Sequence, residues 1–332
     1  MTAESDIFNF VNSVNSVSNP IFLAGPTAVG KSEIALQLAK QIGGEIITVD
    51  SMQVYRGLDI GTAKPSPAER ARVPHHLIDI CDLNESFDAA QFIRLAQLAV
   101  AEIQSRGHVP VFCGGTGLYF KAYMSGLGGA PSANPELRAE LETLPFEALL
   151  RELRKRDPEA YEKIDIQNPR RVIRAVEVIR LTGKKFSEQR AEWKVGSSRC
   201  DGRTAQRAVP TIYCFNRQLA DLHARINARV DEMFRRGLVD ETRELLQRGL
   251  EQNQTAMQAI GYRQVVEHLQ GVRSLAETIE LVKQRTRQFA KRQLTWFRRQ
   301  LAPKWIELKP DEPLETVLAN LQCEIVRQWP AV

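Results

Sequence analysis

The chain has 332 residues, and at roughly 150 residues per domain this length predicts about two domains. A chain of this size can bury a core without disulfides or metal, so a small disulfide-stapled scaffold is excluded. Hydrophobic residues make up 43% and charged residues 26%, and no stretch approaches the ~18 consecutive apolar residues of a membrane span. A membrane protein is therefore excluded as well.

The charge of the chain is nearly balanced overall but unevenly distributed. Lysine and arginine number 45 against 40 acidic residues, which gives a net charge of +5. Residues 1–50 contain two basic and five acidic side chains, whereas residues 281–306 contain eight basic side chains and no acid. A polyanion site must therefore come from a local concentration of charge.

The cysteines and the first twenty residues indicate the compartment. The cysteines are widely spaced, odd in number and show no C-x-x-C pair, so we expect small core residues in a reducing cytoplasm and neither a disulfide framework nor a zinc site. Residues 1–20 lack both a basic start and an apolar run, so they predict a disordered leader and no signal peptide. The cysteines are Cys81, Cys113, Cys200, Cys214 and Cys323.

The first third of the chain alternates strands with helices. A short apolar run at 21–24 precedes a glycine-containing loop and a helical pattern over 34–39, and a second strand at 45–49 ends at Asp50. A helix over 89–104 precedes a third strand at 108–113, which runs into a glycine-rich turn. This order predicts an α/β fold with a parallel sheet flanked by helices and ligands at the carboxyl ends of the strands.

The sequence changes character after about residue 124. A Gly, Pro and Ser stretch with Gly126, Gly128 and Gly129 as hinge candidates leads into charged, helix-rich sequence, and a strand at 210–215 is followed by helices to the end. We expect a leader at 1–20, a catalytic core at 21–124 and 208–332, and a helical insertion domain at 125–207.

The loop after the first strand carries the clearest motif. It matches G-x-x-x-x-G-K-[ST] between a predicted strand and a predicted helix, a pattern typical of nucleotide- and ATP-binding P-loops. Its backbone N–H groups and the helix N-terminus would bind a diphosphate, Lys31 would reach the terminal oxygens, and the Ser32 hydroxyl suits Mg²⁺. The plainer interpretation is a glycine-rich turn with a surface lysine. The motif consists of Gly25, Pro26, Thr27, Ala28, Val29, Gly30, Lys31 and Ser32.

Asp50 follows the second strand, at the edge of the sheet where the P-loop begins. A carboxylate there can hold magnesium, bind a base edge or accept a proton. Alternatively, it only caps the next turn, a position that aspartate favours.

The stretch from Asp50 to Pro65, DSMQVYRGLDIGTAKP, resembles the signature of the tRNA dimethylallyltransferases, also called tRNA isopentenyltransferases. Further blocks of that family follow in order and span residues 21 to 300. They are HHLIDI at 75–80, GGTGLY at 114–119, NPRRVIRA at 168–175, AIGYR at 259–263 and TRQFAKRQLTWF at 286–297.

The resemblance implies transfer of a dimethylallyl group from dimethylallyl diphosphate to N6 of adenosine 37 in the anticodon stem-loop of tRNA. It implies that Asp50 is the general base, and that Arg225 and Lys31 meet the diphosphate charge with Mg²⁺ on Ser32. Arg225 and Arg229 lie one helical turn apart and could point the same way, although two solvated arginines on a surface helix would look the same.

The resemblance also assigns residues to tRNA. Thr116 would lie against the tRNA backbone, but it could instead cap a helix while the glycines around it permit a tight turn. The adjacent His75 and His76 suit a structural or substrate-channel role better than metal ligation, because neighbouring side chains splay apart. The residues assigned to tRNA are Asp50, Ser51, Met52, Gln53, Thr116, Arg170, Arg171, Arg174, Gly261, Tyr262, Arg263, Arg287, Lys291 and Arg292.

The segment from Lys283 to Lys304 interleaves basic and aromatic side chains. Basic side chains bind phosphates and aromatic ones stack on unpaired bases, but an amphipathic helix with a solvated basic face has the same pattern. We expect a mixture, in which Phe289 and Trp296 are buried while Arg287, Lys291 and Arg292 contact RNA.

Two departures from the family pattern are visible. Val29 replaces the serine usual before the second P-loop glycine, which a backbone cradle does not need, and no Cys/His zinc finger follows the core. We therefore expect a bacterial-type monomer in the cytoplasm. The alternatives are an adenylate isopentenyltransferase acting on free AMP, ADP or ATP, a P-loop small-molecule kinase, and a non-catalytic RNA-binding protein.

Overall fold

The computed structural model describes residues 19–191 and 210–327. The expected leader therefore falls almost wholly outside the described residues, as do Cys200 and the polar loop around it. The chain divides into two compact units, Met1–Lys121 with Gln206–Val332 and Ala122–Ala205. No helix among the described residues is long and apolar enough to cross a membrane.

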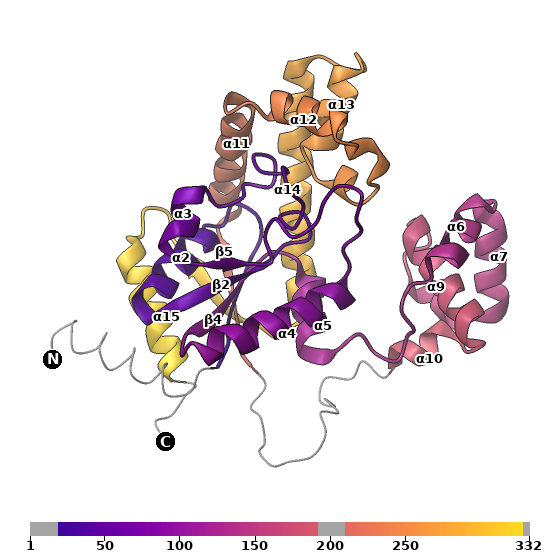
Figure 1. Ribbon diagram of the computed structural model, residues 1–332, viewed down its shortest axis with the longest axis horizontal. Helices are drawn as coiled ribbons and strands as arrows, with labels where there is room; N and C mark the ends of the chain where they lie inside the picture. The colour runs from indigo at the N-terminus through magenta and orange to yellow at the C-terminus, as the bar shows by residue number, and fades with distance from the viewer. Residues whose placement is uncertain (1–18, 192–209, 328–332) are drawn as a thin grey trace, which may run out of the picture. The chain divides into compact units, whose positions relative to one another are not determined.

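The core of the first unit is a parallel sheet, and the predicted α/β fold class is confirmed (Figure 1). Its strands lie in the order β3-β2-β4-β1-β5-β6, so β1, which leads into the P-loop, is central. The described strands are β1 (Ile21–Ala24), β2 (Gly44–Val49), β3 (His75–His76), β4 (Val109–Gly114), β5 (Ile212–Arg217) and β6 (Lys304–Leu308).

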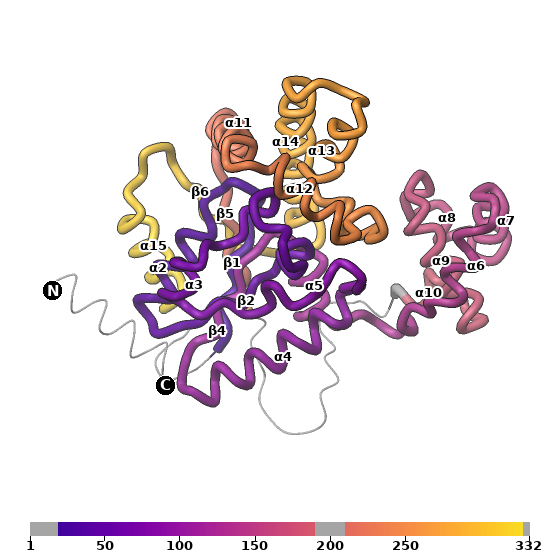
Figure 2. The backbone as a smooth tube through the Cα atoms, turned by 45° about the horizontal axis from the view of Figure 1, so that its top comes forward, coloured from indigo at the N-terminus to yellow at the C-terminus, as the bar shows by residue number. Residues whose placement is uncertain are grey.

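Helices cover both faces of this sheet because successive strand residues point to opposite sides. Ile21 and Leu23 of β1 belong to the core beneath α2 (Lys31–Ile42) and α15 (Leu314–Val326). Phe22 points to the other side and stacks on Phe112 of β4 with ring centroids 4.8 Å apart. Helix α4 (Ala89–Ser105) packs on the sheet there, and Figure 2 shows it on the far side from α2.

Parallel registry brings the loops of the site to one edge of the sheet. Ala24 pairs with Gly114, Gly114 pairs with Val49, and Ala24 also pairs with Cys214. The P-loop, Asp50 and the glycine-rich turn after β4 therefore leave the sheet side by side.

Two strands were not expected. β3 has two residues, too short for a periodic pattern, and β6 follows the helix that ends at Gln300, where we expected helices to continue. Of the cysteines expected in the core, Cys81, Cys113 and Cys214 are buried, but Cys323 is exposed.

A helical layer completes the first unit. Helix α11 packs against the long helix α14, and α12 packs against α13 (Figure 1). The remaining helices of this unit are α3 (Pro67–Arg72), α5 (Gly117–Ser125), which extends into the second unit, α11 (Leu219–Arg235), α12 (Leu238–Gln247), α13 (Tyr262–Leu269) and α14 (Leu275–Gln300).

The second unit is a helical domain with its own core. Leu141, Leu149 and Leu153 pack against Val172 and Val176 and bury its interior. Gly126 and Gly128, two of the hinge candidates, have φ of 75° and lie near the start of this unit. Its helices are α6 (Pro135–Thr143), α7 (Phe146–Arg156), α8 (Pro158–Lys163), α9 (Pro169–Thr182) and α10 (Phe186–Ala191).

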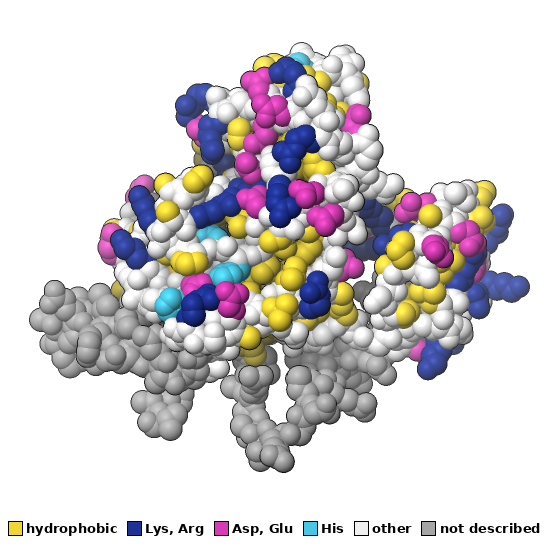
Figure 3. Space-filling view, viewed as in Figure 1, with side chains coloured by type: hydrophobic (Ala, Val, Ile, Leu, Met, Phe, Trp, Pro, Cys, Tyr) yellow, Lys and Arg dark blue, Asp and Glu magenta, His cyan; other side chains and the backbone are white. Residues whose placement is uncertain are grey.

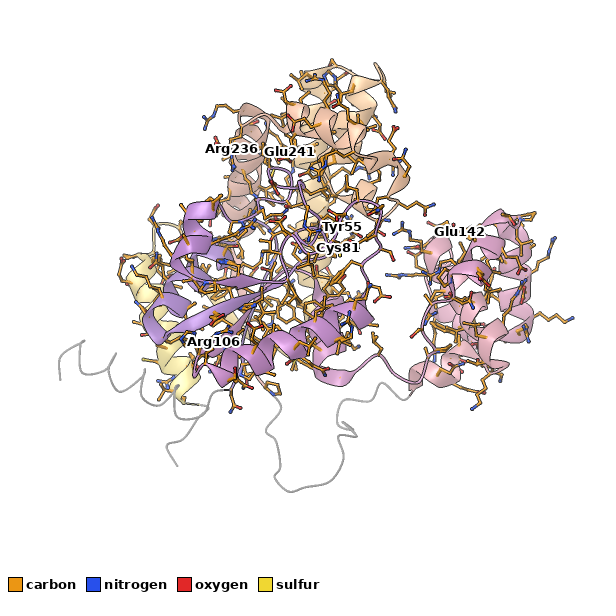
Figure 4. The ribbon with its side chains drawn as sticks, in the orientation of Figure 1. Tyr55, Cys81, Arg106, Glu142, Arg236 and Glu241 are labelled. Carbon is orange, nitrogen blue, oxygen red and sulfur yellow. The ribbon has the colours of Figure 1, made fainter. Side chains whose placement is uncertain are left out.

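A buried carboxylate ties together the amino-terminal ends of β2, β3 and β4. Glu45 is only 2% exposed, and it accepts hydrogen bonds from Arg106, His76 and His108, the two histidine contacts being 2.6 Å long. Figure 3 shows histidines among acidic and basic side chains on this face, and Figure 4 labels Arg106. Because His76 is used here, far from the carboxyl edge, its role is structural.

Replacing this carboxylate is expected to change stability in a pH-dependent way. Burial raises the pKa of Glu45, but the hydrogen bonds from Arg106, His76 and His108 outweigh it and lower the pKa to about 2. The stabilisation is fully present above the ordinary value of 4.5 and is lost as the pH falls toward 2. Glu45→Gln should lower the free energy of unfolding by roughly 1–3 kcal/mol at pH 6. Urea titrations of both proteins should show this difference shrinking between pH 5 and 3; a constant difference would contradict it.

Candidate functional site

The P-loop has the geometry of an anion-binding nest. Ala28 and Gly30 have φ of 63° and 105°, the left-handed conformation that turns successive N–H groups toward one side. Helix α2 begins directly afterwards at Lys31, so the positive end of its dipole faces the same space. At Gly25 a Cβ would lie 3.0 Å from the Val29 side chain and 3.1 Å from the Phe215 carbonyl, so only glycine fits without a shift.

Lys31 folds back over the loop that precedes it. Its Nζ donates to the Pro26 carbonyl at 3.1 Å, the only partner found among the described residues. Burial lowers the pKa of Lys31, and nearby Arg229 lowers it further, while Cys113 and Asp50 act in the opposite direction. A half-buried cation with unused N–H groups is suited to receive an anionic ligand.

Two arginines contact the backbone carbonyl groups of the P-loop. Arg225 Nε donates to the Ala28 carbonyl at 3.0 Å, and Arg217 Nε donates to the Val29 carbonyl at 2.8 Å. Because a trans peptide points its C=O and N–H in opposite directions, the Arg217 contact turns the N–H of Gly30 inward, while the N–H of Val29 donates to the Pro26 carbonyl at 3.4 Å. A Cβ at Gly30 would lie 3.6 and 3.7 Å from Nη2 of Arg217 and Arg225, so both guanidinium groups border the nest.

The sequence does not single out Arg217 as a site residue, and it relates Arg229 to the site only through its spacing from Arg225. The position of Arg217 as the last residue of β5, at the carboxyl edge, is the signal that could have identified it. Arg229 Nε is buried with no hydrogen-bond partner among the described residues, and burial lowers the pKa of Arg229 while Asp50 raises it. The alternative of two solvated arginines on α11 therefore does not fit Arg229, whereas Arg225 is exposed and, in the described part of the chain, is engaged only through its contact with the P-loop.

Asp50 caps the turn that follows β2 through one of its two carboxylate oxygens. Its Oδ1 accepts from the N–H of Met52 at 2.8 Å and of Gln53 at 3.3 Å, which caps the turn after β2. Among the described residues, no partner is found for Oδ2. Asp50 also acts electrostatically on Lys31 and Arg229, so it lies close to the P-loop cations. One carboxylate oxygen is thus structural and the other is available for chemistry.

The glycines around Thr116 are needed for close packing. None of Gly114, Gly115 and Gly117 has a positive φ. A Cβ would collide with the Val49 carbonyl at Gly114 and with the Trp296 ring at Gly117. The alternative that these glycines serve only to permit a tight turn is therefore wrong, because close packing against neighbouring residues requires them. Thr116 Oγ1 accepts from the Ser51 N–H at 3.2 Å, which joins this turn to the one after Asp50.

The stretch that follows Asp50 is anchored at its far end by Lys64. The side chain of Lys64 is 1% exposed, and its Nζ donates to the Tyr55 carbonyl at 2.8 Å and forms ion pairs with Asp59 and Asp79. Gln53 Nε2 also donates to the Thr62 carbonyl at 3.0 Å, so its side chain is engaged within the loop. Lys64 lies in GTAKP, the end of the signature at 50–65, and this is the only feature of the sequence that could have identified it as an anchor.

Tyr262 is a correction to the expected tRNA-contacting set. It is fully buried, and its hydroxyl donates to Glu241 at 2.6 Å and accepts from the Gly61 N–H at 3.1 Å. Glu241 also accepts from the Ile60 N–H at 2.9 Å, and Figure 4 shows this residue on α12. Burial raises the pKa of both Glu241 and Tyr262. A side chain enclosed in this way braces the 51–64 loop and does not reach RNA.

Its two neighbours in the motif differ from it. Gly261 has a φ of 106° at the start of α13, a conformation that favours glycine. Arg263 is exposed and forms an ion pair with Glu267 at 3.2 Å. Only Arg263 presents a side chain to an external ligand.

Arg174 requires a similar correction. On α9 of the second unit it forms an ion pair with the buried Glu177 at 2.7 Å and donates to the Pro131 carbonyl. These contacts use Arg174 to hold the start of its own domain. Arg170 and Arg171, at the first turn of the same helix, are exposed.

Helix α14 exposes a basic and aromatic surface. Lys291 and Arg292 are exposed, and Arg292 lies over the ring of Phe289 at 5.8 Å. The expected burial of Phe289 is wrong, because the buried stripe of α14 runs through Ala290 and Phe297 and leaves Phe289 to one side. Trp296 is half-buried. Arg287 donates to Asn227 of α11.

The residues present fit a magnesium ion bound together with a diphosphate. Ser32 is exposed in the first turn of α2. Among the described residues there is no group of three or more His, Cys, Asp or Glu side chains that could hold a metal alone. Mg²⁺ usually takes one or two protein ligands and completes its shell with phosphate oxygens and water.

Comparisons with known proteins agree on one family. Residues 53–300 match the family described as IPP transferase. The chain is 44% identical over 300 residues to a tRNA dimethylallyltransferase of Geobacter sulfurreducens, covering 89% of this chain and 94% of that protein. It is 48% identical over 284 residues to a tRNA dimethylallyltransferase of Halorhodospira halophila, covering 84% and 89%.

Solved structures give the same result. The fold is similar to that of a tRNA isopentenylpyrophosphate transferase of Bacillus halodurans, with a TM-score of 0.67, 39% identity and coverage of 94% and 97% of the two chains. It is also similar to a eukaryotic dimethylallyltransferase acting on tRNA, with a TM-score of 0.74, 28% identity and coverage of 93% and 77%.

Proposed function

The chain belongs to the IPP transferase family and is a tRNA dimethylallyltransferase, and we propose how its side chains carry out that reaction. The enzyme transfers a dimethylallyl group from dimethylallyl diphosphate to N6 of adenosine 37 of tRNA and releases diphosphate. The observation that carries the assignment of roles is that the P-loop with Lys31 and the turn with Asp50 leave the same edge of the sheet, where Arg229 interacts electrostatically with both.

The P-loop side of the site holds the leaving group. As the allylic C–O bond breaks, negative charge grows on the diphosphate. The N–H of Gly30, the N-terminus of α2 and the side chains of Lys31, Arg225 and Arg229 stabilise that charge. Ser32 would hold Mg²⁺, which supplies additional positive charge to the diphosphate when bound.

The β2 side of the site holds the acceptor. The exocyclic amine of adenine is a weak nucleophile, and it must lose a proton as its N6–C bond forms. Asp50 Oδ2 accepts this proton, while the contacts of Oδ1 with Met52 and Gln53 hold the carboxylate in place. Ser51 and Thr116, joined by a hydrogen bond, lie beside Asp50 where the base enters.

The tRNA contacts are assigned to exposed side chains. On α14 these are Lys291 and Arg292, with Phe289 as a stacking surface, and on the second unit they are Arg170 and Arg171. We propose that the second unit binds the anticodon stem-loop. A tRNA substrate is consistent with an enzyme of the cytoplasm. A monomer is sufficient for activity, because one chain supplies every group that the proposed reaction uses.

The assignment is tested by offering two acceptors. Protein, Mg²⁺ and dimethylallyl diphosphate are incubated with tRNA or with AMP, and N6-prenyladenosine is detected by mass. We expect product on tRNA and none on AMP. Product on AMP alone would indicate an adenylate isopentenyltransferase, and phosphoryl transfer from ATP in a parallel reaction without a prenyl donor would indicate a kinase.

Charge reversal on α14 is expected to weaken tRNA binding and reduce its salt dependence. A phosphate contact releases condensed counterions, so each contributes about −0.7 to −0.9 to the slope of log K against log salt. Arg292→Glu should therefore remove about one phosphate contact and make the slope shallower by about 0.7 to 0.9. The affinity for dimethylallyl diphosphate should remain unchanged.

The matched control is Lys40→Glu, which makes the same charge change on the exposed last turn of α2. Dissociation constants for tRNA across a salt series should separate the two variants. Equal slopes for parent and Arg292→Glu would mean that this face of α14 is only solvated.

A further inference from the structure

Gln293 connects the two halves of the site. It lies on α14 and is 8% exposed. Its Oε1 accepts from the Thr27 N–H in the P-loop at 2.9 Å, and its Nε2 donates to the Gly115 carbonyl at 2.9 Å. Both ends of the amide are thus used, and a flipped amide would place donor against donor and acceptor against acceptor.

The loop on the acceptor side is shaped to receive this amide. A Cβ at Gly115 would collide with Nε2 of Gln293, so glycine leaves the space that the contact needs. The next residue, Thr116, accepts from the Ser51 N–H beside Asp50. A continuous series of contacts therefore runs from the diphosphate cradle through Gln293 to the turn that holds the general base.

We propose that Gln293 is a positioning residue that sets the distance between the prenyl donor and the acceptor amine, a role that rests on the proposed function. A displacement reaction depends steeply on the separation and alignment of its two reactants, and a misplacement of about 1 Å can cost about 10²-fold in rate. Gln293 fixes the two loops relative to each other and touches neither reactant. Its loss therefore affects the rate with both substrates bound more than the affinity for either one.

Two substitutions separate the contacts. Gln293→Met has a similar length and removes both hydrogen bonds. Gln293→Glu keeps the acceptor for the Thr27 N–H but, when ionised, cannot donate to the Gly115 carbonyl. A protonated glutamic acid can donate again, so the rate of Gln293→Glu relative to the parent should rise as the pH falls.

A glutamine elsewhere in the molecule provides the control. Gln322 on α15 has the same 8% exposure, and its Nε2 donates to Gln41 at 2.7 Å, joining two helices without touching a substrate loop. Gln322→Met should perturb packing as much as Gln293→Met but leave the chemistry unchanged.

The measurements are the dissociation constants of dimethylallyl diphosphate and tRNA and the single-turnover rate with both saturating. We expect Gln293→Met to lower the rate about 10- to 100-fold and to change each dissociation constant by less than about threefold. A parental rate in Gln293→Met, or an equal loss in Gln322→Met, overturns the role. Should Gln293→Met fail to fold, a pH-independent rate ratio for Gln293→Glu overturns it. A parent that prenylates no tRNA overturns the proposed function itself.

Discussion

Asp50→Asn is expected to slow prenyl transfer by roughly 10²- to 10⁴-fold, the usual effect of losing a general base. Asparagine keeps an oxygen that can accept from the N–H groups of Met52 and Gln53, so the turn after β2 should survive. What is lost is the basic oxygen that accepts the amine proton. The single-turnover rate with saturating tRNA and dimethylallyl diphosphate measures the effect.

The control for Asp50→Asn is binding. Affinity for dimethylallyl diphosphate and the unfolding midpoint in urea should remain close to those of the parent, because the substitution removes no P-loop contact and preserves the cap. Near-parental turnover in Asp50→Asn would leave Asp50 with its capping role alone.

The sequence predicts well where local chemistry and sheet geometry act together. The P-loop, Asp50 and the Thr116 turn follow three strands whose parallel pairing is implied by strand and helix alternation, so their meeting at one edge needs no further information. β3 and β6 escaped prediction because two residues carry no period and because β6 exists only through pairing with β5.

Membership of a family block does not say which way a side chain points. Gly261, Tyr262 and Arg263 are consecutive, yet only Arg263 is exposed, because the buried Tyr262 donates its hydroxyl to the half-buried Glu241 of α12. Arg174 likewise differs from Arg170 by one helical turn but faces Glu177. The direction in which Tyr262 points depends on a partner more than twenty residues away in the chain. The direction in which Arg174 points depends on how the helices of its domain pack, which the sequence does not reveal.

Long-range backbone contacts are equally invisible in the sequence. Arg217 and Arg225 both contact P-loop carbonyls almost two hundred residues earlier in the chain, and Gln293 lies farther still. Spacing along α11 brings Arg225 and Arg229 to one face, but it cannot tell a solvated face from one that packs against the nest.

Lys31→Met is expected to reduce the single-turnover rate by about 10²- to 10³-fold, the range for removing one donor from developing charge. Affinity for dimethylallyl diphosphate should fall much less, because Arg225, Arg229 and the P-loop amides still meet the ground-state charge and the lysine matters most as the leaving group separates.

The pKa of Lys31, lowered by burial, adds an expectation about stability. Because burial disfavours the charged form of the lysine, Lys31→Met should leave the free energy of unfolding unchanged or raise it. Lys40→Met, in the exposed last turn of the same helix, is the matched control and should alter neither quantity. An equal loss of affinity and rate in Lys31→Met would show that the lysine binds the diphosphate uniformly, and a marked loss of stability would show that its contact with the Pro26 carbonyl holds the loop together.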